Sequence, residues 1–346
     1  MSASESPVRV LPDHPSLEHQ RKRARALLRA WRARDPHAAL HDAQRAIARE
    51  YGFTSWAEMK RHIGARQSLS ALDSVSLVVA AHRALETELE HPLFRDPLAR
   101  SLAGNDGFAL FATLRSTSWP GFGRGPEPYV SIRTRYFDDA LLCAVREHRL
   151  TQVVIVAAGM DTRAFRLNWP SGVSLFEIDS SRVFARKESV LHHVDASPRC
   201  ERRIVKADAI RFAGALIKAG FDPLRPAAFL VERALVYFDT SEVLRLFRQV
   251  RRLASPGSWL GCEFTSAATL ASPFMKPMFD RFKTLGRPRW IFGIDEPEEF
   301  LERFGWSGSS VLPGAPQANY GRWLYGYFPR GTPGVPRSFL FVGRRH

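Results

Sequence analysis

The sequence QVVIVAAGMDTRAFRL, residues 152–167, decides the fold of this chain. Its run Val153–Val156 is continuously β-branched, which is typical of a strand buried on both faces of a parallel sheet. Residues 157–159, Ala-Ala-Gly, have almost no side chain, so they allow a tight turn that a ligand can approach closely. Asp161 and Thr162 can then cap a following helix. A small-residue turn between a buried strand and a helix is where open α/β sheets bind nucleotide-like ligands.

Beyond this stretch, apolar strand patterns alternate with helical patterns. Strands are predicted at residues 153–156, 173–176, 203–205, 227–231 and 259–264, with helices at 182–191, 209–219 and 241–253 between them. The alternation predicts an α/β fold with a mostly parallel sheet and helices on both faces. Two further strands, expected at 309–312 and 338–342, bring the sheet to seven strands. Such a sheet fits the class I, Rossmann-like methyltransferases better than a dinucleotide dehydrogenase.

The N-terminal part predicts a separate helical module. Residues 1–15 are rich in Ser and Pro and are expected to be a disordered tail. Short helices are expected within residues 16–66, followed by a linker at 64–72. The module is interpreted as a helical appendage to the main domain, and the alternative is a docking or nucleic-acid-binding module. The main domain is expected at 73–346, where the aromatic-rich stretch 266–295 is expected to be an insertion that caps a pocket.

The composition and net charge indicate which classes of partner the chain could bind. The 346 residues carry a net charge of +15, and only seven of the 50 basic residues are lysine. A basic surface favours an anionic partner such as nucleic acid, but an arginine-biased proteome explains the charge equally well. The basic residues are dispersed, with no aromatic-interleaved tract of the kind that binds RNA. A nucleic-acid partner therefore stays open without being favoured.

Location and metal content follow from similar arguments. No apolar run approaches the roughly 20 residues that span a bilayer, and the first residues lack a signal-peptide pattern. The sequence thus predicts a cytoplasmic protein with no membrane partner. The three cysteines, Cys143, Cys200 and Cys262, are widely spaced and form no CxxC pair. We expect neither a disulfide framework nor a metal site, and we interpret His192-His193 as a surface pair.

Acidic residues follow three further predicted strands. Asp179 lies twenty residues beyond Gly159, a spacing suited to accepting the ribose hydroxyls of an adenosine. Asp208 follows the next strand and can accept a hydrogen bond from an adenine amino group. Glu232 ends the strand AFLVE and can pair with an ammonium group. A single acidic residue after a strand is usually a helix cap, but features at four strand ends in register favour a binding site.

The pattern favours a sulfonium cofactor over a dinucleotide. AAGMDT lacks the G-x-G-x-x-G that a pyrophosphate needs. A positively charged cofactor also fits a binding site lined with carboxylates better than a negatively charged diphosphate does. The sequence therefore predicts that S-adenosyl-L-methionine binds at these strand ends.

From about Asp73 to the end, the chain resembles the leucine carboxyl methyltransferase family, in its bacterial branch of S-adenosyl-L-methionine-dependent methyltransferases. The stretches that carry the resemblance are VVAAHRALETELEHPLFRDPLAR, SIRTRYFDDAL, QVVIVAAGMDTRAFRLNWP, LFEIDSSRVFARK, VKADAIRF, AGFDPLRPAAFLVERALVYF and ASPGSWLGCEF. They occur in the family's order and span most of that region. The resemblance implies a class I methyltransferase sheet that carries extra helices over the site.

The resemblance also implies which residues bind the cofactor. They are Arg133, Ala158, Gly159, Asp179, Asp208, Ala209 and Glu232. By position, Arg133 corresponds to the arginine that holds the cofactor carboxylate, and Glu232 to the residue at its methionine end. Asp179 corresponds to the ribose ligand, and Asp208 with Ala209 to the adenine site.

This chain departs from the family pattern at two places. The family usually has Glu-Gly where Glu232-Arg233 stands, and Asp-Leu-Arg where Asp208 is followed by Ala209 and Ile210. A bulky Arg233 would narrow the pocket or offer a cation to an anionic substrate. The departures leave the cofactor assignment in place and affect the assignment of the acceptor.

The leading functional hypothesis is O-methylation of a small molecule, at a carboxylate or a hydroxyl. A carboxylate is already ionised at neutral pH, so its methylation needs no general base. Arg233, Tyr237 and Arg135 are candidates to orient the acceptor, although surface solvation and core packing explain them equally well. Tyr237 is a candidate base if the acceptor is a hydroxyl. The alternatives are a methyltransferase that acts on a protein C-terminus or RNA, and an inactive protein that binds S-adenosylmethionine.

Overall fold

The computed structural model describes the whole chain except residues 1–15 and 119–125, so the predicted disordered tail and most of a Gly/Pro-rich loop lie outside the described residues. By its internal contacts the chain divides into two compact units, Met1–Leu72 and Asp73–His346. Each unit has a hydrophobic core of its own, and the two are described separately below. Within the described ranges, no helix is both long enough and apolar enough to cross a membrane.

The first unit contains three helices around a small core. They are α1 (Leu17–Arg32), α2 (Leu40–Glu50) and the start of α3 (Trp56–Thr87). Ala24, Ile47, Met59 and Ile63 are buried together between them. The structure differs from the expected linker at 64–72, because α3 continues through it as one helix. That stretch contains one glycine and no proline, and a single glycine costs a helix only about 1 kcal/mol relative to alanine.

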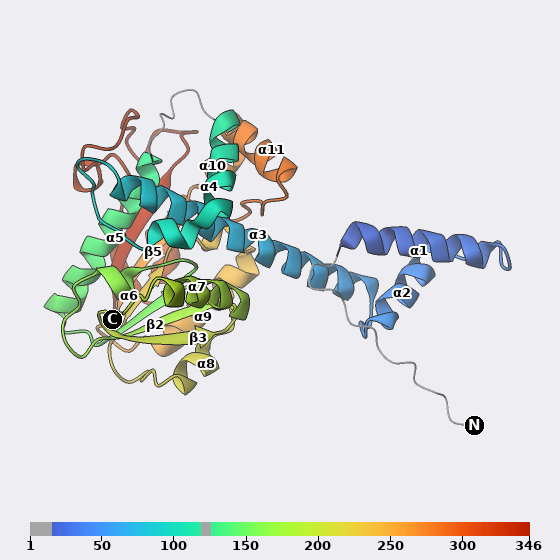
Figure 1. Cartoon of the computed structure of the whole chain (residues 1–346), viewed down its shortest axis with the longest axis horizontal. Coiled ribbons are helices and arrows are strands. Elements are labelled where there is room, and N and C mark those ends of the chain that lie inside the picture. Colours follow the sequence, from blue (N-terminus) through green and yellow to red (C-terminus); the bar gives the residue numbers. More distant parts are fainter. Residues whose placement is uncertain (1–15, 119–125) are drawn as a thin grey trace. The chain divides into compact units, whose positions relative to one another are not determined.

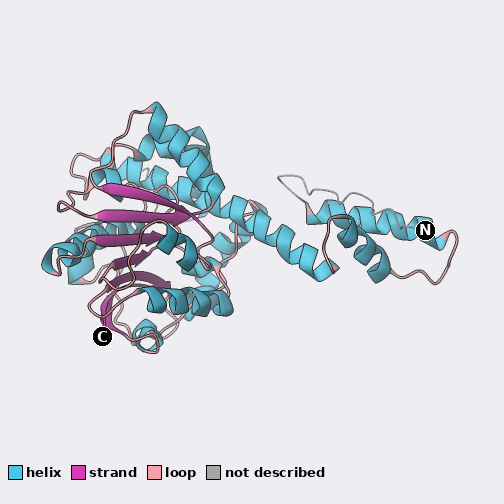
Figure 2. Ribbon diagram, turned by 90° about the horizontal axis from the view of Figure 1, so that it is seen from below, coloured by secondary structure: helices cyan, strands magenta, loops and turns pink. Residues whose placement is uncertain are grey.

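The second unit is built on one seven-stranded sheet with the order β3-β2-β1-β4-β5-β7-β6. The strands are β1 (Gln152–Val156), β2 (Ser174–Asp179), β3 (Glu201–Lys206), β4 (Ala228–Val231), β5 (Trp259–Thr265), β6 (Trp306–Val311) and β7 (Ser338–Arg345). Neighbouring strands from β3 to β5 pair in parallel, and β7 runs antiparallel to both β5 and β6. Figure 2 shows the strands stacked in a twisted sheet with helices on both sides. The predicted fold class is confirmed.

Helices cover both faces because successive β1 residues point to opposite sides. Val154 and Val156 belong to a core shared with α8 (Ala213–Lys218), α9 (Thr240–Leu253) and α12 (Pro297–Glu302). Val153 and Ile155 belong to the opposite core. That core is shared with residues of α3, α4 (Ala99–Ser118), α5 (Pro128–Glu147), α6 (Arg163–Arg166) and α7 (Ser181–His193). Figure 1 shows α3, α4 and α5 on one side of the strands.

The register brings the important strand ends to one edge. Val156, the last residue of β1, lies opposite Ile178 of β2 and Val231 of β4. The residues that directly follow these strands therefore meet at the carboxyl edge of the sheet, where open α/β sheets bind ligands. Beyond β5, the chain forms α10 (Ala267–Ala271), the 3-10 turn η2 (Pro273–Met275) and α11 (Lys276–Thr284).

Candidate functional site

The turn after β1 has an unusual backbone. Ala157 has φ 55° and Gly159 has φ 49°, so two residues of the turn lie in the left-handed region. A Cβ atom at Gly159 would lie 2.8 Å from the Cβ of Ser76 on α3. Ala158 is held because its N–H donates to the carbonyl of Ile178 (3.0 Å). The turn thus needs glycine at position 159 for both conformation and space.

Asp179 is the last residue of β2 and contacts this turn directly. Its Oδ2 accepts a hydrogen bond from the Gly159 N–H, and its Oδ1 accepts one from the Ser180 N–H, each at 2.7 Å. The side chain is half-buried. Asp179 therefore fixes the turn after β1 to the end of β2.

Asp208 and Ala209 lie in the turn after β3. Asp208 is exposed, and its Oδ1 accepts a hydrogen bond from the Ile210 N–H (2.8 Å). This turn occupies the residues expected to begin a helix, so α8 begins only at Ala213. Ala209 is half-buried and packs against the core. The two residues thus form an open turn at the carboxyl end of β3.

Arg133 and Glu232 lie together in the structure. The Nε of Arg133 donates to Oε1 of Glu232 (2.6 Å), and Oε2 of Glu232 pairs with Nη2 of Arg163 (2.8 Å). Burial alone would raise the pKa of the Glu232 carboxyl, but Arg163 and Arg133 more than offset burial, so its pKa is lowered. Arg133 Nη1 and Glu232 Oε2 are both buried without a hydrogen-bond partner, although each belongs to an ion pair.

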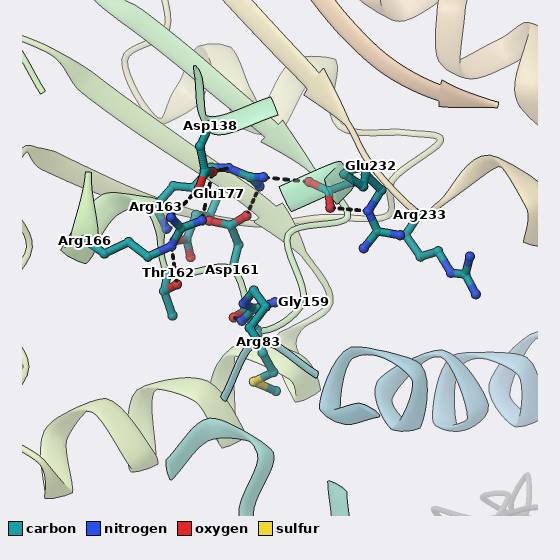
Figure 3. Close-up of polar contacts among 12 residues, drawn as sticks. Arg83, Asp138, Gly159, Asp161, Thr162, Arg163, Arg166, Glu177, Glu232 and Arg233 are labelled. Carbon is teal, nitrogen blue, oxygen red and sulfur yellow. Dashed lines mark hydrogen bonds and ion pairs between the residues drawn. The ribbon is translucent and has the colours of Figure 1, made fainter. Parts of the chain in front are cut away.

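Arg163 holds this pair in a buried ionic network. It pairs with Asp138 (2.8 Å), Asp161 and Glu232, while Arg166 pairs with Asp138 at 2.5 Å. Figure 3 shows Arg163 between these three carboxylates. Of the two residues predicted to cap α6, Asp161 accepts a hydrogen bond from the Arg163 N–H through Oδ1 (2.7 Å). The Thr162 side chain makes no cap bond, and its Oγ1 instead donates to Asp96 (2.6 Å).

Glu263 on β5 contacts both Arg133 of α5 and Arg233, which follows the end of β4. It accepts hydrogen bonds from the Tyr129 hydroxyl (2.5 Å) and from the Arg233 N–H (2.8 Å), and it lies 3.3 Å from Arg133 Nη1. Sequence reasoning missed Arg163 and Glu263. The signal for Glu263 was available, because a charged residue inside an apolar strand must have a buried partner.

A cavity of about 720 Å³ opens beside this edge of the sheet. Arg233 and Tyr237 line it, together with Val75 next to Ser76, and residues of the predicted cap, 266–295, form part of its wall. Figure 3 shows that the Arg233 side chain extends away from the Arg163 network. Arg135 is not among the lining residues, because its guanidinium bonds to Asp139 (2.6 Å) and to the carbonyl of Leu93 (2.7 Å). Within the described parts of the chain, no cluster of three or more His, Cys, Asp or Glu side chains can hold a metal ion.

The sequence is similar to a known protein family and to individual relatives. The model of a family described as leucine carboxyl methyltransferase matches residues 76–251. A putative S-adenosyl-L-methionine-dependent methyltransferase from Parafrankia sp. (strain EAN1pec) is 36% identical over 257 residues, which cover 72% of this chain and 81% of that protein. A protein with the same description from Mycobacteroides abscessus is 32% identical over 266 residues, covering 73% and 89%.

A solved structure has the same fold. The crystal structure of a DUF574 family protein from Streptomyces avermitilis matches with a TM-score of 0.51 and 15% identity, and covers 77% of this chain and 97% of that one. At this identity the likeness concerns the fold alone. The family match spans half of the chain and agrees with the relatives at 32–36% identity. The chain belongs to the leucine carboxyl methyltransferase family.

Proposed function

We propose that this S-adenosyl-L-methionine-dependent methyltransferase transfers the methyl group to an oxygen atom of a small molecule, either a carboxylate or a hydroxyl. The observation that carries the proposal is the cavity of about 720 Å³ beside the carboxyl end of β4, with Arg233 and Tyr237 in its wall. A cavity of this size is typical of small-molecule sites. A cation in its wall would attract an anionic acceptor.

The residues at the strand ends fit the cofactor. Arg133 Nη1 and Glu232 Oε2 are a buried donor and a buried acceptor without hydrogen bonds. They match the carboxylate and the ammonium of an amino acid. We assign the ribose to Asp179 and the adenine to the open turn at Asp208 and Ala209. Ala158 and Gly159 then provide the close backbone approach.

When bound, the cofactor supplies a methyl group on a positively charged sulfur. The chain holds the acceptor oxygen in line and excludes water, which can account for a large part of the rate enhancement. A carboxylate acceptor needs no general base, because it is ionised at neutral pH. For a hydroxyl acceptor, we assign Tyr237 in this wall as the general base, whose phenolate oxygen would take the proton of the hydroxyl and become the neutral phenol.

Calorimetric titration with S-adenosylmethionine tests the cofactor assignment. We expect the wild-type protein to bind, and we expect Asp179→Ala to weaken binding by at least about tenfold, because a ribose hydrogen bond to a charged group is lost. Asp42→Ala on α2 is the control for loss of a carboxylate, since Asp42 is exposed and belongs to the first unit. An unchanged affinity in Asp179→Ala would contradict the assignment of Asp179 to the ribose. A wild-type protein that does not bind S-adenosylmethionine would contradict the proposal that the protein is a methyltransferase.

The position of transfer is tested on the product. A methyl ester releases methanol in mild alkali, whereas a methyl ether does not, so radiolabelled methyl groups distinguish the two oxygens. A methyl group transferred to nitrogen or carbon would resist alkali. Mass spectrometry of the product fragments would then place the label on that atom rather than on oxygen. That result would overturn the proposed O-methylation and leave the cofactor assignment intact.

A further inference from the structure

The backbone of Arg233 is held in the cavity wall, but its side chain lacks a hydrogen-bond partner at Nε. Its φ of 58° is in the left-handed region, and its N–H is held by Glu263. The guanidinium lies over the ring of Trp290, with Cζ 4.7 Å from the centroid, and Nη1 is 3.8 Å from Glu263 Oε1. Its Nε is buried and has no hydrogen-bond partner. The charge is therefore oriented by stacking and one long ion pair rather than neutralised by a bidentate partner.

Arg287 is a second cation in the same cavity, and no sequence motif singles it out. Its Cζ lies 5.6 Å from the ring centroid of Phe282, and its Nε is buried without a hydrogen bond. Burial, and after it repulsion from Arg233, lowers the pKa of Arg287, although Tyr237 opposes this shift. Among the residues that the structure describes, no carboxylate forms an ion pair with its guanidinium. A buried cation without a counter-ion lowers the stability of the protein, unless an anion binds beside it.

The acidic groups of the cavity do not supply that anion. Glu263 is already engaged by Tyr129, Arg133 and the Arg233 N–H. Glu127 lines the cavity, but among the described residues its carboxyl forms no ion pair with Arg233 or Arg287. Burial raises the pKa of this carboxyl, even though Arg233 and Arg133 pull in the opposite direction. The two arginines therefore leave a local excess of positive charge that a bound anion would relieve.

Much of the remaining wall is apolar and aromatic, with a few polar side chains such as His82, Thr269 and Arg337. Trp290 and Phe282 pack together with ring centroids 6.0 Å apart, and they belong to a cluster of the cap with Val236 and Met275. On the cavity lining, Tyr327 is 52% exposed, so aromatic surface is open to an entering ligand. Flat rings stack well on such surfaces.

We infer that Arg233 and Arg287 together form an anion-binding pair, and that the acceptor is an aromatic carboxylic acid whose carboxylate binds between them while its rings lie against Trp290 and Phe282. The inference rests on the proposed function, which supplies the methyl donor, and it adds the group by which the acceptor is recognised. It also gives Arg233 a role in this chain at the position where the family usually has glycine.

Equilibrium binding of two probes tests this pair in the protein saturated with S-adenosylhomocysteine. The probes are 2-naphthoate and its neutral analogue 2-naphthalenemethanol, which share their rings and differ in charge. We expect the wild type to prefer naphthoate by about tenfold or more, because two charge-assisted contacts are made. We expect Arg287→Met to abolish the preference. Arg289→Met is the matched control, since Arg289 is exposed two residues away and does not line the cavity.

Arg233→Gly adds a readout that a merely structural role would not give. Glycine removes the strain of a positive φ, so the melting temperature should rise while the affinity for naphthoate falls. Equal affinity for both probes in the wild type, no naphthoate binding at millimolar concentration, or an unchanged preference in Arg287→Met would each overturn the inference. Titration of S-adenosylmethionine into the same proteins without S-adenosylhomocysteine separates this outcome from a failure of the proposed function, because the cofactor would still bind.

Discussion

At the scale of single residues, Gly159 combines a backbone requirement with a packing requirement. It has φ 49°, and an added Cβ would lie 2.8 Å from the Cβ of Ser76. We expect Gly159→Ala to lower the free energy of unfolding by more than the roughly 1 kcal/mol of the left-handed conformation alone. It should also weaken S-adenosylmethionine binding by about tenfold or more, because the turn carrying the Gly159–Asp179 hydrogen bond must shift. Urea unfolding and calorimetry measure the two effects.

Gly172 provides the matched control for this substitution. It has φ 78°, and nothing lies within 4 Å of the Cβ that alanine would add. Gly172→Ala should therefore show only the conformational cost, with unchanged affinity for the cofactor. If the two alanine variants lose equal stability and both keep full affinity, the contact with Ser76 has no part in forming the site.

The sequence predicted those residues of the candidate site that follow strands directly. The structure brings Gly159 and Asp179 into contact and Arg133 onto Glu232, while their roles toward the cofactor stay predictions. Arg163 and Glu263 were missed, because most of their partners, such as Asp138 and Glu232 for Arg163, come from distant parts of the chain. A pairing between residues 163 and 232 depends on register and burial, which no local pattern contains.

At the scale of elements, all seven strands were predicted from apolar runs. The predicted ends of the elements were wrong where polar turns or positions at the edge of the sheet weaken the apolar pattern. β6 begins at Trp306 rather than 309, on the edge of the sheet where Ser307 and Ser309 are exposed. The continuity of α3 was missed because Gly64 and the small polar residues after it look like a connection. Propensity alone could not decide there, because tertiary context overrides it.

The turn between β1 and α6 gives a prediction of pH dependence. Burial alone would raise the pKa of Asp161, but Arg163, and to a lesser extent Lys187 and Arg166, lower it from 3.8 to about 2. A carboxyl whose pKa is depressed by folding stabilises the protein above its unfolded pKa. That contribution, roughly 2 to 3 kcal/mol, is present above about pH 4 and is lost as the pH falls toward 2.

Urea unfolding between pH 5 and pH 3 measures this contribution as a slope of stability against pH. Asp161→Asn should flatten the slope, whereas Asp106→Asn, at a carboxylate that is 69% exposed, should keep it. Carbon-13 NMR titration of the wild-type carboxyl groups checks the same pKa without a substitution. An Asp161 carboxyl that titrates near 4 would show that Arg163 does not stabilise its charge in the folded protein.

At the scale of the whole molecule, the candidate site is assembled entirely within the second unit. It draws Ser76 from α3, Arg133 from α5, Glu232 from the end of β4 and Glu263 from β5. The sheet explains this convergence, because its parallel strands all end at one edge. The first unit has its own core of Ala24, Ile47, Ala48, Met59 and Ile63. None of those residues belongs to the cores that cover the sheet.

Truncation at the boundary between the units tests this independence. We expect a chain that begins at Asp73 to unfold cooperatively and to bind S-adenosylmethionine within about threefold of the full chain. It keeps Leu77, Val78 and Ala81, with which α3 packs into the core on one face of the sheet. A chain that begins at Ala84 is the control, and it should lose both properties because those side chains are removed. If the chain from Asp73 folds but binds more than tenfold weaker, the helical module contributes to the cofactor site.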